Sequence, residues 1–132
     1  MTSQLNVDTI KGQTTAGSVT IQGEGTKTTN LQQGLAKAWS QVKQTDTWAM
    51  NDSFNISSGV DSTTGISGMT VTSNFSNVYY SAHCTNDSGG WGHNGCIDDV
   101  TTSFYKMYQM QTDTTGAADT ARTQSAAHGD LA

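Results

Sequence analysis

The sequence predicts a mainly β protein: a small β-sandwich-like module with an extended N-terminal arm and a polar C-terminal tail. Hydrophobic residues make up 33% of the chain and charged residues only 13%, so the polarity comes mostly from Thr, Ser, Asn, Gln and Gly. Threonine suits pleated strands, whereas Ser, Asn and Gly suit the turns between them. Short alternating segments separated by glycine-containing stretches are typical of sandwiches and barrels. A core with so few apolar residues would be stabilised by contact with a partner surface, so we expect an oligomer.

Residues 1–30 are predicted to form the extended arm. Leu5 and Val7 alternate with polar residues, as do Val19 and Ile21, and glycines punctuate the segment. This pattern gives short strands and turns with too little apolar area for an independent core. The arm is therefore expected to lie on the rest of the chain, on its symmetry mates or on a larger particle.

Residues 31–112 are predicted to form the module, and its first segment has two interpretations. Asn30 could cap a helix that carries Leu31, Leu35, Ala38 and Val42 at helical spacing. Residues 31–44 could instead form a short helical turn that ends at Gly34, followed by a strand over residues 37–43. Periodicity taken alone favours the helix.

The rest of the module is predicted from alternation at period two and from strand-forming residues. The predicted strands are residues 53–57, 69–72, 78–81 and 101–110, with loops at 59–65 and 86–95. Residues 113–132 carry no large apolar face, which predicts a polar tail that is either mobile or a docking arm.

The charge and the missing motifs exclude several classes of function. A net charge of −5 with Arg122 as the only arginine argues against a nucleic-acid partner, which requires clustered basic residues. No run is long enough to insert into a membrane, and the first residues lack the pattern of a signal peptide. Phosphate-loop, dinucleotide, zinc-protease and serine-hydrolase motifs are missing. We therefore expect a protein that is not an enzyme and uses no cofactor.

Cys84 and Cys96 bracket a glycine-rich loop, and three interpretations of them are open. A disulfide between them would close the loop and add about 3 kcal/mol of stability. Two unpaired thiols are the second interpretation. In the third, His83, Cys84, His93 and Cys96 supply zinc ligands, but their spacing fits no standard finger and neighbours on a strand point to opposite faces. We therefore expect no metal site.

The same loop contains the candidate binding residues Trp91, His93 and Asn94. An aromatic residue on an exposed loop is a common anchor for a sugar or a protein partner. The alternative is that Trp91 folds back and covers a thin core. The neighbouring Asp98 and Asp99 diverge if they lie on a strand, so we assign them to the solvated surface.

Two motifs resemble a known family. Residues 34–39 read GLAKAW and residues 52–58 read DSFNISS, and weaker similarity continues through Asp61, Gly65, residues 69–71, Phe75 and residues 79–80. Together they resemble a C-terminal tip domain of tail-fibre-like proteins from phages of marine bacteria and cyanobacteria, and residues 5–10 resemble the opening of such fibres. The resemblance implies a β-sandwich-like, commonly trimeric module in which a strand begins at Lys37, so we choose the turn followed by a strand. Two features depart from the family: the chain has no room for a fibre shaft, and the cysteine-containing loop is not part of the pattern.

These observations predict a non-catalytic bacteriophage virion structural protein at the particle surface, either a tail-fibre-like appendage or a head decoration (cement) protein. We expect a homotrimer that contacts other virion proteins after assembly in the bacterial host cytoplasm. The alternative is a receptor-binding module that recognises a glycan or protein on the host surface.

Overall fold

The computed structural model describes residues 4–13, 19–22, 25–87, 93–111 and 116–132. The chain divides into two compact units, Met1–Leu35 and Ala36–Ala132. The boundary therefore lies a few residues later than the expected end of the arm at residue 30. Among the described residues, no helix has the length and apolar character needed to cross a membrane.

The N-terminal unit is a small hairpin followed by one helical turn. Strand β1 (Thr20–Gln22) pairs antiparallel with β2 (Thr28–Asn30), and α1 (Leu31–Gly34) follows directly. The predicted strand around Val19 and Ile21 is therefore present, whereas the alternation at Leu5 and Val7 produces no strand. None of the described residues in this unit is fully buried, as expected for a segment without its own core.

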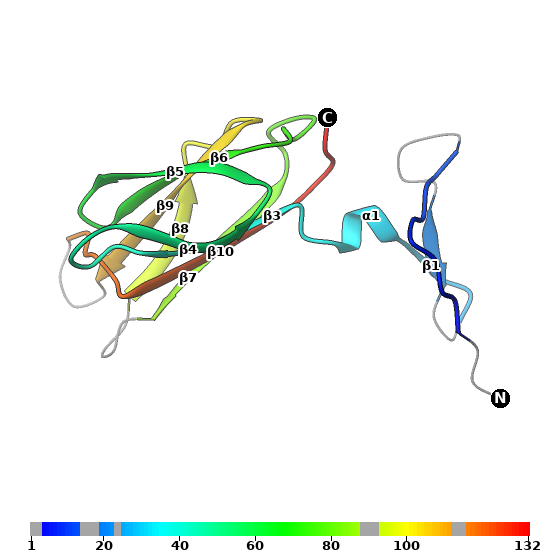
Figure 1. Cartoon of the computed structure of the whole chain (residues 1–132), viewed down its shortest axis with the longest axis horizontal. Coiled ribbons are helices and arrows are strands. Elements are labelled where there is room, and N and C mark those ends of the chain that lie inside the picture. Colours follow the sequence, from blue (N-terminus) through cyan, green and yellow to red (C-terminus); the bar gives the residue numbers. More distant parts are fainter. Residues whose placement is uncertain (1–3, 14–18, 23–24, 88–92, 112–115) are drawn as a thin grey trace. The chain divides into compact units, whose positions relative to one another are not determined.

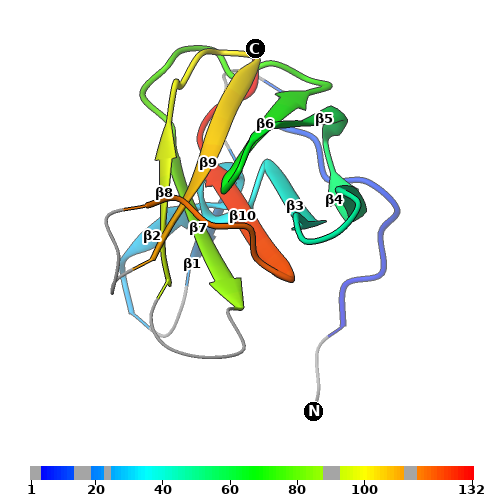
Figure 2. The same cartoon turned by 90° about the vertical axis from the view of Figure 1, so that its left-hand side faces the viewer.

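The second unit is a sandwich of two four-stranded antiparallel sheets (Figure 1). The first sheet has the order β4 (Ala49–Phe54), β3 (Ala38–Lys43), β10 (Arg122–His128), β7 (Ser81–Asp87). The second sheet has the order β5 (Ile56–Thr63), β6 (Ile66–Val71), β9 (Phe104–Gln111), β8 (His93–Asp98). Figure 2 shows β4 and β5 at one edge of the sandwich and β7 and β8 at the other. The predicted mainly β, sandwich-like fold is thus confirmed.

The ambiguous segment forms a turn followed by a strand, as the family resemblance implied. Helix α1 ends at Gly34 and β3 begins at Ala38, while Leu35, which the helical interpretation would bury, is exposed. Ala38, Ser40 and Val42 point inward at period two. Pairing of β3 with β4 and β10 on its two sides overrides the local helical spacing.

Asn55 carries the chain from the first sheet into the second. It lies between β4 and β5 with a φ of 57°, a left-handed conformation that asparagine tolerates better than most residues. Its side-chain amide donates to the Lys37 and Ser73 carbonyls at 2.9 and 3.1 Å, and its Oδ1 accepts from the Ser73 N–H at 2.7 Å. The expected strand over residues 53–57 is consequently split at its centre.

The prediction of a polar tail over residues 113–132 is wrong, because Arg122–His128 forms β10 in the middle of the first sheet. Thr123, Ser125 and Ala127 are its buried residues. They are too small and too polar to give an apolar signal in the sequence. They are buried because larger side chains of the second sheet face them.

Two further segment predictions are also wrong. The expected loop over residues 59–65 is mostly strand, since β5 continues to Thr63 and only Thr64 and Gly65 form the turn. The expected strand over residues 78–81 is irregular up to Ser81, where β7 begins. The predicted closing strand over residues 101–110 is confirmed as β9, with a start three residues later.

The interior combines an apolar centre with hydrogen-bonded polar groups. Met69, Phe75, Tyr105 and Met107 are the largest buried apolar side chains. The Tyr105 hydroxyl and the Ser125 hydroxyl are hydrogen-bonded at 2.8 Å across the two sheets. A buried polar group costs stability unless it has such a partner, so these networks allow a thin apolar core to remain closed.

A second interior network surrounds the Gln44 amide. Its Nε2 donates to the Ser67 hydroxyl at 3.1 Å, and its Oε1 accepts from the Thr120 and Thr123 hydroxyls at 3.1 and 3.3 Å. The Trp48 indole N–H donates to the same Ser67 hydroxyl at 2.9 Å. Through Gln44, the network connects Ser67 on β6 with Thr120, in the segment before β10.

Candidate functional site: the outer face of the first sheet

The binding loop predicted from the sequence cannot be placed in full. Trp91 and the side chain of His93 lie outside the described residues. Asn94 is exposed on β8, directly opposite Met110 of β9. The predicted role of this loop therefore stays a prediction.

The two cysteines are free thiols on neighbouring strands at one edge of the sandwich. Cys84 is buried, and its Sγ donates to the Cys96 carbonyl oxygen at 3.2 Å. The Cys96 side chain is exposed on the opposite, outer side of its strand, beside Tyr108. The thiols thus point in different directions, and a disulfide between them, one of the interpretations left open by the sequence, would require one side chain to turn.

The close approach of β7 and β8 depends on Gly95, because a Cβ at this position would lie 2.7 Å from the Cys84 Sγ. Burial raises the pKa of the Cys84 thiol to about 11. His83 is exposed on the opposite face of β7 from Cys84, as the alternation of a strand requires. Within the described ranges, no three His, Cys, Asp or Glu side chains gather as metal ligands would.

The outer face of the first sheet brings aromatic residues from three separate segments into one row. Residues directly opposite each other in antiparallel strands point to the same face. The register pairs Phe54 with Trp39, Trp39 with Ala126, and Ala126 with His83. Inward-pointing Ala38, Ser40 and Val42 show that Trp39 faces outward. We call these four residues, which cross all four strands, the aromatic row.

The side chains of the aromatic row are accessible. Phe54 is 53% exposed and Trp39 is 36% exposed, which leaves both rings available to a partner. His83 is also exposed, and its ring stacks at 6.1 Å between centroids on that of His128, the last residue of β10. Ala126 contributes only a methyl group between Trp39 and His83.

A second row, of polar residues, runs beside the first. The register pairs Asp52 with Gln41, Gln41 with Gln124, and Gln124 with Thr85, and all four point outward. In the part of the chain that the structure describes, the side chains of Gln41 and Gln124 make no hydrogen bond. The Asp52 Oδ1 accepts only the N–H of the adjacent Ser53, at 2.8 Å. We call these four residues the polar row.

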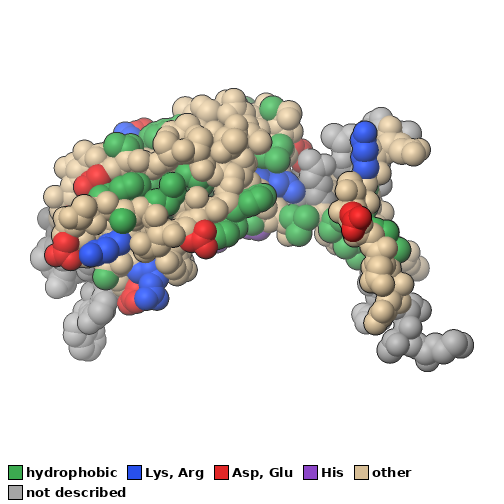
Figure 3. All heavy atoms as spheres, viewed as in Figure 1, with side chains coloured by type: hydrophobic (Ala, Val, Ile, Leu, Met, Phe, Trp, Pro, Cys, Tyr) green, Lys and Arg blue, Asp and Glu red, His purple; other side chains and the backbone are tan. Residues whose placement is uncertain are grey.

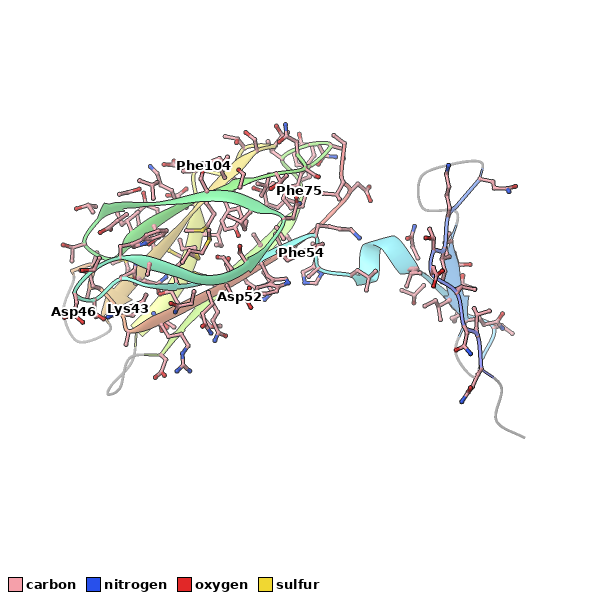
Figure 4. The ribbon with its side chains drawn as sticks, in the orientation of Figure 1. Lys43, Asp46, Asp52, Phe54, Phe75 and Phe104 are labelled. Carbon is pink, nitrogen blue, oxygen red and sulfur yellow. The ribbon has the colours of Figure 1, made fainter. Side chains whose placement is uncertain are left out.

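Lys43 and Arg122, on the same face, are each paired with an aspartate. The Lys43 ammonium lies 3.1 Å from the Asp46 carboxylate, and the Arg122 guanidinium lies 3.6 Å from the Asp87 carboxylate. Figure 4 shows Phe54 and Asp52 along β4, with Lys43 and Asp46 near its far end. These pairs leave the face around Trp39 with little net charge.

The outer face of the second sheet has a different character. Phe104 lies across Gly68, where a Cβ would come within 2.7 Å of the ring, and Val60 borders the same glycine. Val60 and, farther along the sheet, Met110 are exposed. The Lys106 ammonium is hydrogen-bonded to the Asp99 carboxylate there, which raises the pKa of the lysine. This face offers apolar contact area, with the exposed Asn94 directly opposite Met110.

Trp39 and Phe54 belong to the motifs GLAKAW and DSFNISS, but nothing in the sequence places them together. It missed His83, Gln41 and Gln124 as a group. Alternation of Trp39, Gln41 and Lys43 at period two is a signal that these three share a face. No local signal connects them to Gln124, because residues 113–132 were predicted as a tail.

Comparisons of the chain with protein-family models, with curated proteins and with solved structures find no match.

Proposed function

We propose that the protein is a non-catalytic structural protein of a bacteriophage virion, located at the particle surface. In this role the sandwich is the displayed module and the N-terminal unit is the anchor. The particle position is either a tail-fibre-like appendage or a head decoration. The motifs GLAKAW and DSFNISS support the phage assignment through their resemblance to tail-fibre-like tip domains.

The observation that carries the anchoring role is the exposure of apolar side chains in the N-terminal unit. Leu5, Val7, Ile10, Ile21 and Leu35 are all more than half exposed. Figure 3 shows hydrophobic side chains at the surface of this unit. Burying such side chains against another protein stabilises association by about 25 cal/mol per Å² of apolar surface removed from water. An assembled particle supplies a surface of that kind.

We further propose that the protein is a homotrimer. The thin apolar core supports association, and so do the exposed Val60 and Met110 on the outer face of the second sheet. Exposed apolar side chains on a sheet face are a common feature of subunit interfaces. Light scattering coupled to size exclusion tests this directly, since a trimer has three times the 14.0 kDa chain mass.

The anchoring role is tested by changing the apolar residues in the full chain. Virions are prepared with the native protein, with the triple variant Leu5→Asp, Val7→Asp, Ile10→Asp, and with the matched polar control Asn6→Asp, Asp8→Asn. Quantitative mass spectrometry of purified virions measures copies per particle. We expect the triple variant to be lost and the control to be retained. Normal incorporation of the triple variant would contradict the anchor.

The native copy number separates the two particle positions. Hundreds of copies per virion indicate a head decoration arranged on the capsid lattice. A few to tens of copies indicate a tail appendage.

A further inference from the structure

We propose that the outer face of the first sheet is a carbohydrate-binding site, with the Trp39 and Phe54 rings as its platform and the polar row as its hydrogen-bonding partner. The ligand class is a neutral oligosaccharide. This binding role goes beyond the structural role proposed above and does not depend on the anchoring of the N-terminal unit.

The aromatic rings of Trp39 and Phe54 lie side by side on paired strands. A sugar ring has one apolar C–H face, and a solvent-exposed aromatic ring on a rigid element provides a complementary flat surface. Trp39 and Phe54 are direct cross-strand partners, so their Cβ atoms lie about 4.5–5.5 Å apart. Both rings belong to strands paired within one sheet, which holds their spacing without a loop. The platform is long enough for adjacent sugar units.

Uncommitted polar groups lie next to that platform. Hydroxyl groups at the edge of a sugar require both donors and acceptors, and an amide side chain offers both. Gln41 is two residues from Trp39 on β3, and Gln124 is two residues from Ala126 on β10. Neither amide has a hydrogen-bond partner among the described residues, whereas the buried Gln44 and Gln109 are both hydrogen-bonded. The Asp52 carboxylate adds a strong acceptor at the end of the row.

The charges on this face bear on the charge of the ligand. The nearby cations Lys43 and Arg122 are each paired with an aspartate, and Asp52 is unpaired by any cation in the described chain. An anionic ligand, such as a phosphorylated or carboxylated polymer, would meet no free positive charge here. A single-stranded nucleic acid also stacks on aromatic rings, but it requires a basic groove along its backbone. The charges of this face therefore favour a neutral ligand.

A second copy of the chain is the main competing occupant. The centre of a protein interface is usually enriched in apolar and aromatic groups and dry. Covering the polar row with protein would remove the Gln41 and Gln124 amides from water, at a cost of about 1–3 kcal/mol for each group left without a partner. A hydroxylated ligand supplies those partners.

The test begins with the purified full chain on an array of neutral and acidic oligosaccharides. The neutral set includes glucose-, galactose- and mannose-based chains. The strongest neutral binder is then titrated into the native protein and into Trp39→Ala, Phe54→Ala and Gln124→Ala. The control is Tyr79→Ala, which removes an aromatic ring that is 91% exposed in the loop before β7 and belongs to neither row. Thermal unfolding of each variant confirms that it is folded.

We expect at least one neutral oligosaccharide to bind. Trp39→Ala and Phe54→Ala should each weaken the affinity about tenfold or more, as for a central aromatic contact. Gln124→Ala, whose side chain makes no contact with the core, should weaken it about threefold to tenfold through a lost hydrogen bond. Tyr79→Ala should leave the affinity unchanged.

A measurement on the native protein locates the ligand without any substitution. The indole N–H signal of Trp39 should shift in NMR spectra on titration, while that of Trp48, which is hydrogen-bonded to Ser67 inside the sandwich, should stay in place. The Trp39→Phe variant identifies the signal.

Three results would overturn the proposal. The first is the lack of any binding to neutral oligosaccharides, and the second is binding that Trp39→Ala leaves intact. The third is self-association of the native chain that Trp39→Ala abolishes, which would make this face an interface between copies. A trimer whose mass is unaffected by Trp39→Ala agrees with both proposals, since the interface then lies elsewhere.

Discussion

The two faces of the first sheet reverse the usual distribution of side-chain size. The inner face is built from small residues, among them Ala38, Ser40, Ser125 and Ala127, whereas the outer face carries Trp39 and Phe54. The second sheet supplies the bulk of the interior, with Met69, Tyr105 and Met107. Small residues on one sheet thus accommodate large residues on the other, as close packing of an interior requires.

The polar groups of the inner face take part in folding, whereas those of the outer face do not. The hydroxyls and amides of the inner face are paired with each other, so every one of them is tied to the packing of the sandwich. The amides of the outer face are unpaired within the described chain. Aromatic rings and amides that folding leaves on the surface are available for binding.

The largest loss of stability is expected when the central buried side chain, Tyr105, is removed. We expect Tyr105→Ala to lower the free energy of unfolding by about 3–5 kcal/mol, because it leaves a cavity and removes one of the two hydrogen-bond partners of the Ser125 hydroxyl, the other being Ser40. The matched control is Tyr108→Ala, a half-buried tyrosine on the same strand, which should cost about 1–2 kcal/mol. Urea unfolding measures both. Equal losses would show that the two faces of β9 contribute alike.

The next largest loss of stability is expected at Gly65, in the turn between β5 and β6. Gly65 has a φ of 69°, and a Cβ there would lie 2.6 Å from the Ala118 nitrogen and 2.8 Å from the Gln109 carbonyl oxygen. We expect Gly65→Ala to cost about 2–4 kcal/mol through backbone strain and displacement of the segment before β10. Thermal unfolding measures this loss. Gly25→Ala, where no atom lies within 4 Å of the added Cβ, should leave the stability nearly unchanged in the same measurement.

A smaller difference is expected between a paired hydroxyl on the inner face and an unpaired amide on the outer face. Thr123→Val keeps the shape of the inner face but removes the hydroxyl that is hydrogen-bonded to Thr120 at 2.6 Å, so we expect a loss of about 1–2 kcal/mol. Its neighbour on the outer face, Gln124→Ala, should change stability by about 0.5 kcal/mol or less. Denaturant midpoints of the two variants check this, and a larger loss for Gln124→Ala would contradict the assignment of faces.

The two thiols differ in reactivity, because one is buried and the other is exposed. Cys96 is exposed and should react with iodoacetamide in the native protein, whereas Cys84 should react only on unfolding. Burial excludes the reagent from Cys84 and raises its pKa to about 11, which keeps it in the unreactive protonated form at neutral pH. Mass spectrometry after native and denaturing labelling measures both. Resistance of both cysteines to labelling until a reductant is added would instead establish the disulfide.

The sequence by itself determined the class of fold and several of its strands. The predicted strands over residues 69–72 and 101–110 overlap β6 and β9, because their alternation and their β-branched and aromatic residues suit a half-buried pleated sheet. These strands depend on neighbours in the sequence, so local pattern is sufficient to predict them. The end of the helical turn at Gly34 is different, because the helical spacing of residues 31–42 alone favours a longer helix.

Only the tertiary structure decided which residues are inside. Thr123, Ser125 and Ala127 have no apolar signal, and they become core because Tyr105 and its neighbours on the second sheet fill the space beside them. The strand through Asn55 divides between two sheets because Lys37 and Ser73 hold its side chain.

The candidate site has the same origin. The aromatic and polar rows join residues from β3, β4, β7 and β10, whose register is set by backbone pairing between segments up to about ninety residues apart. A sequence pattern reports which residues alternate along one strand. It contains no information about which strand lies next to it, and that neighbour decides which side chains form a surface.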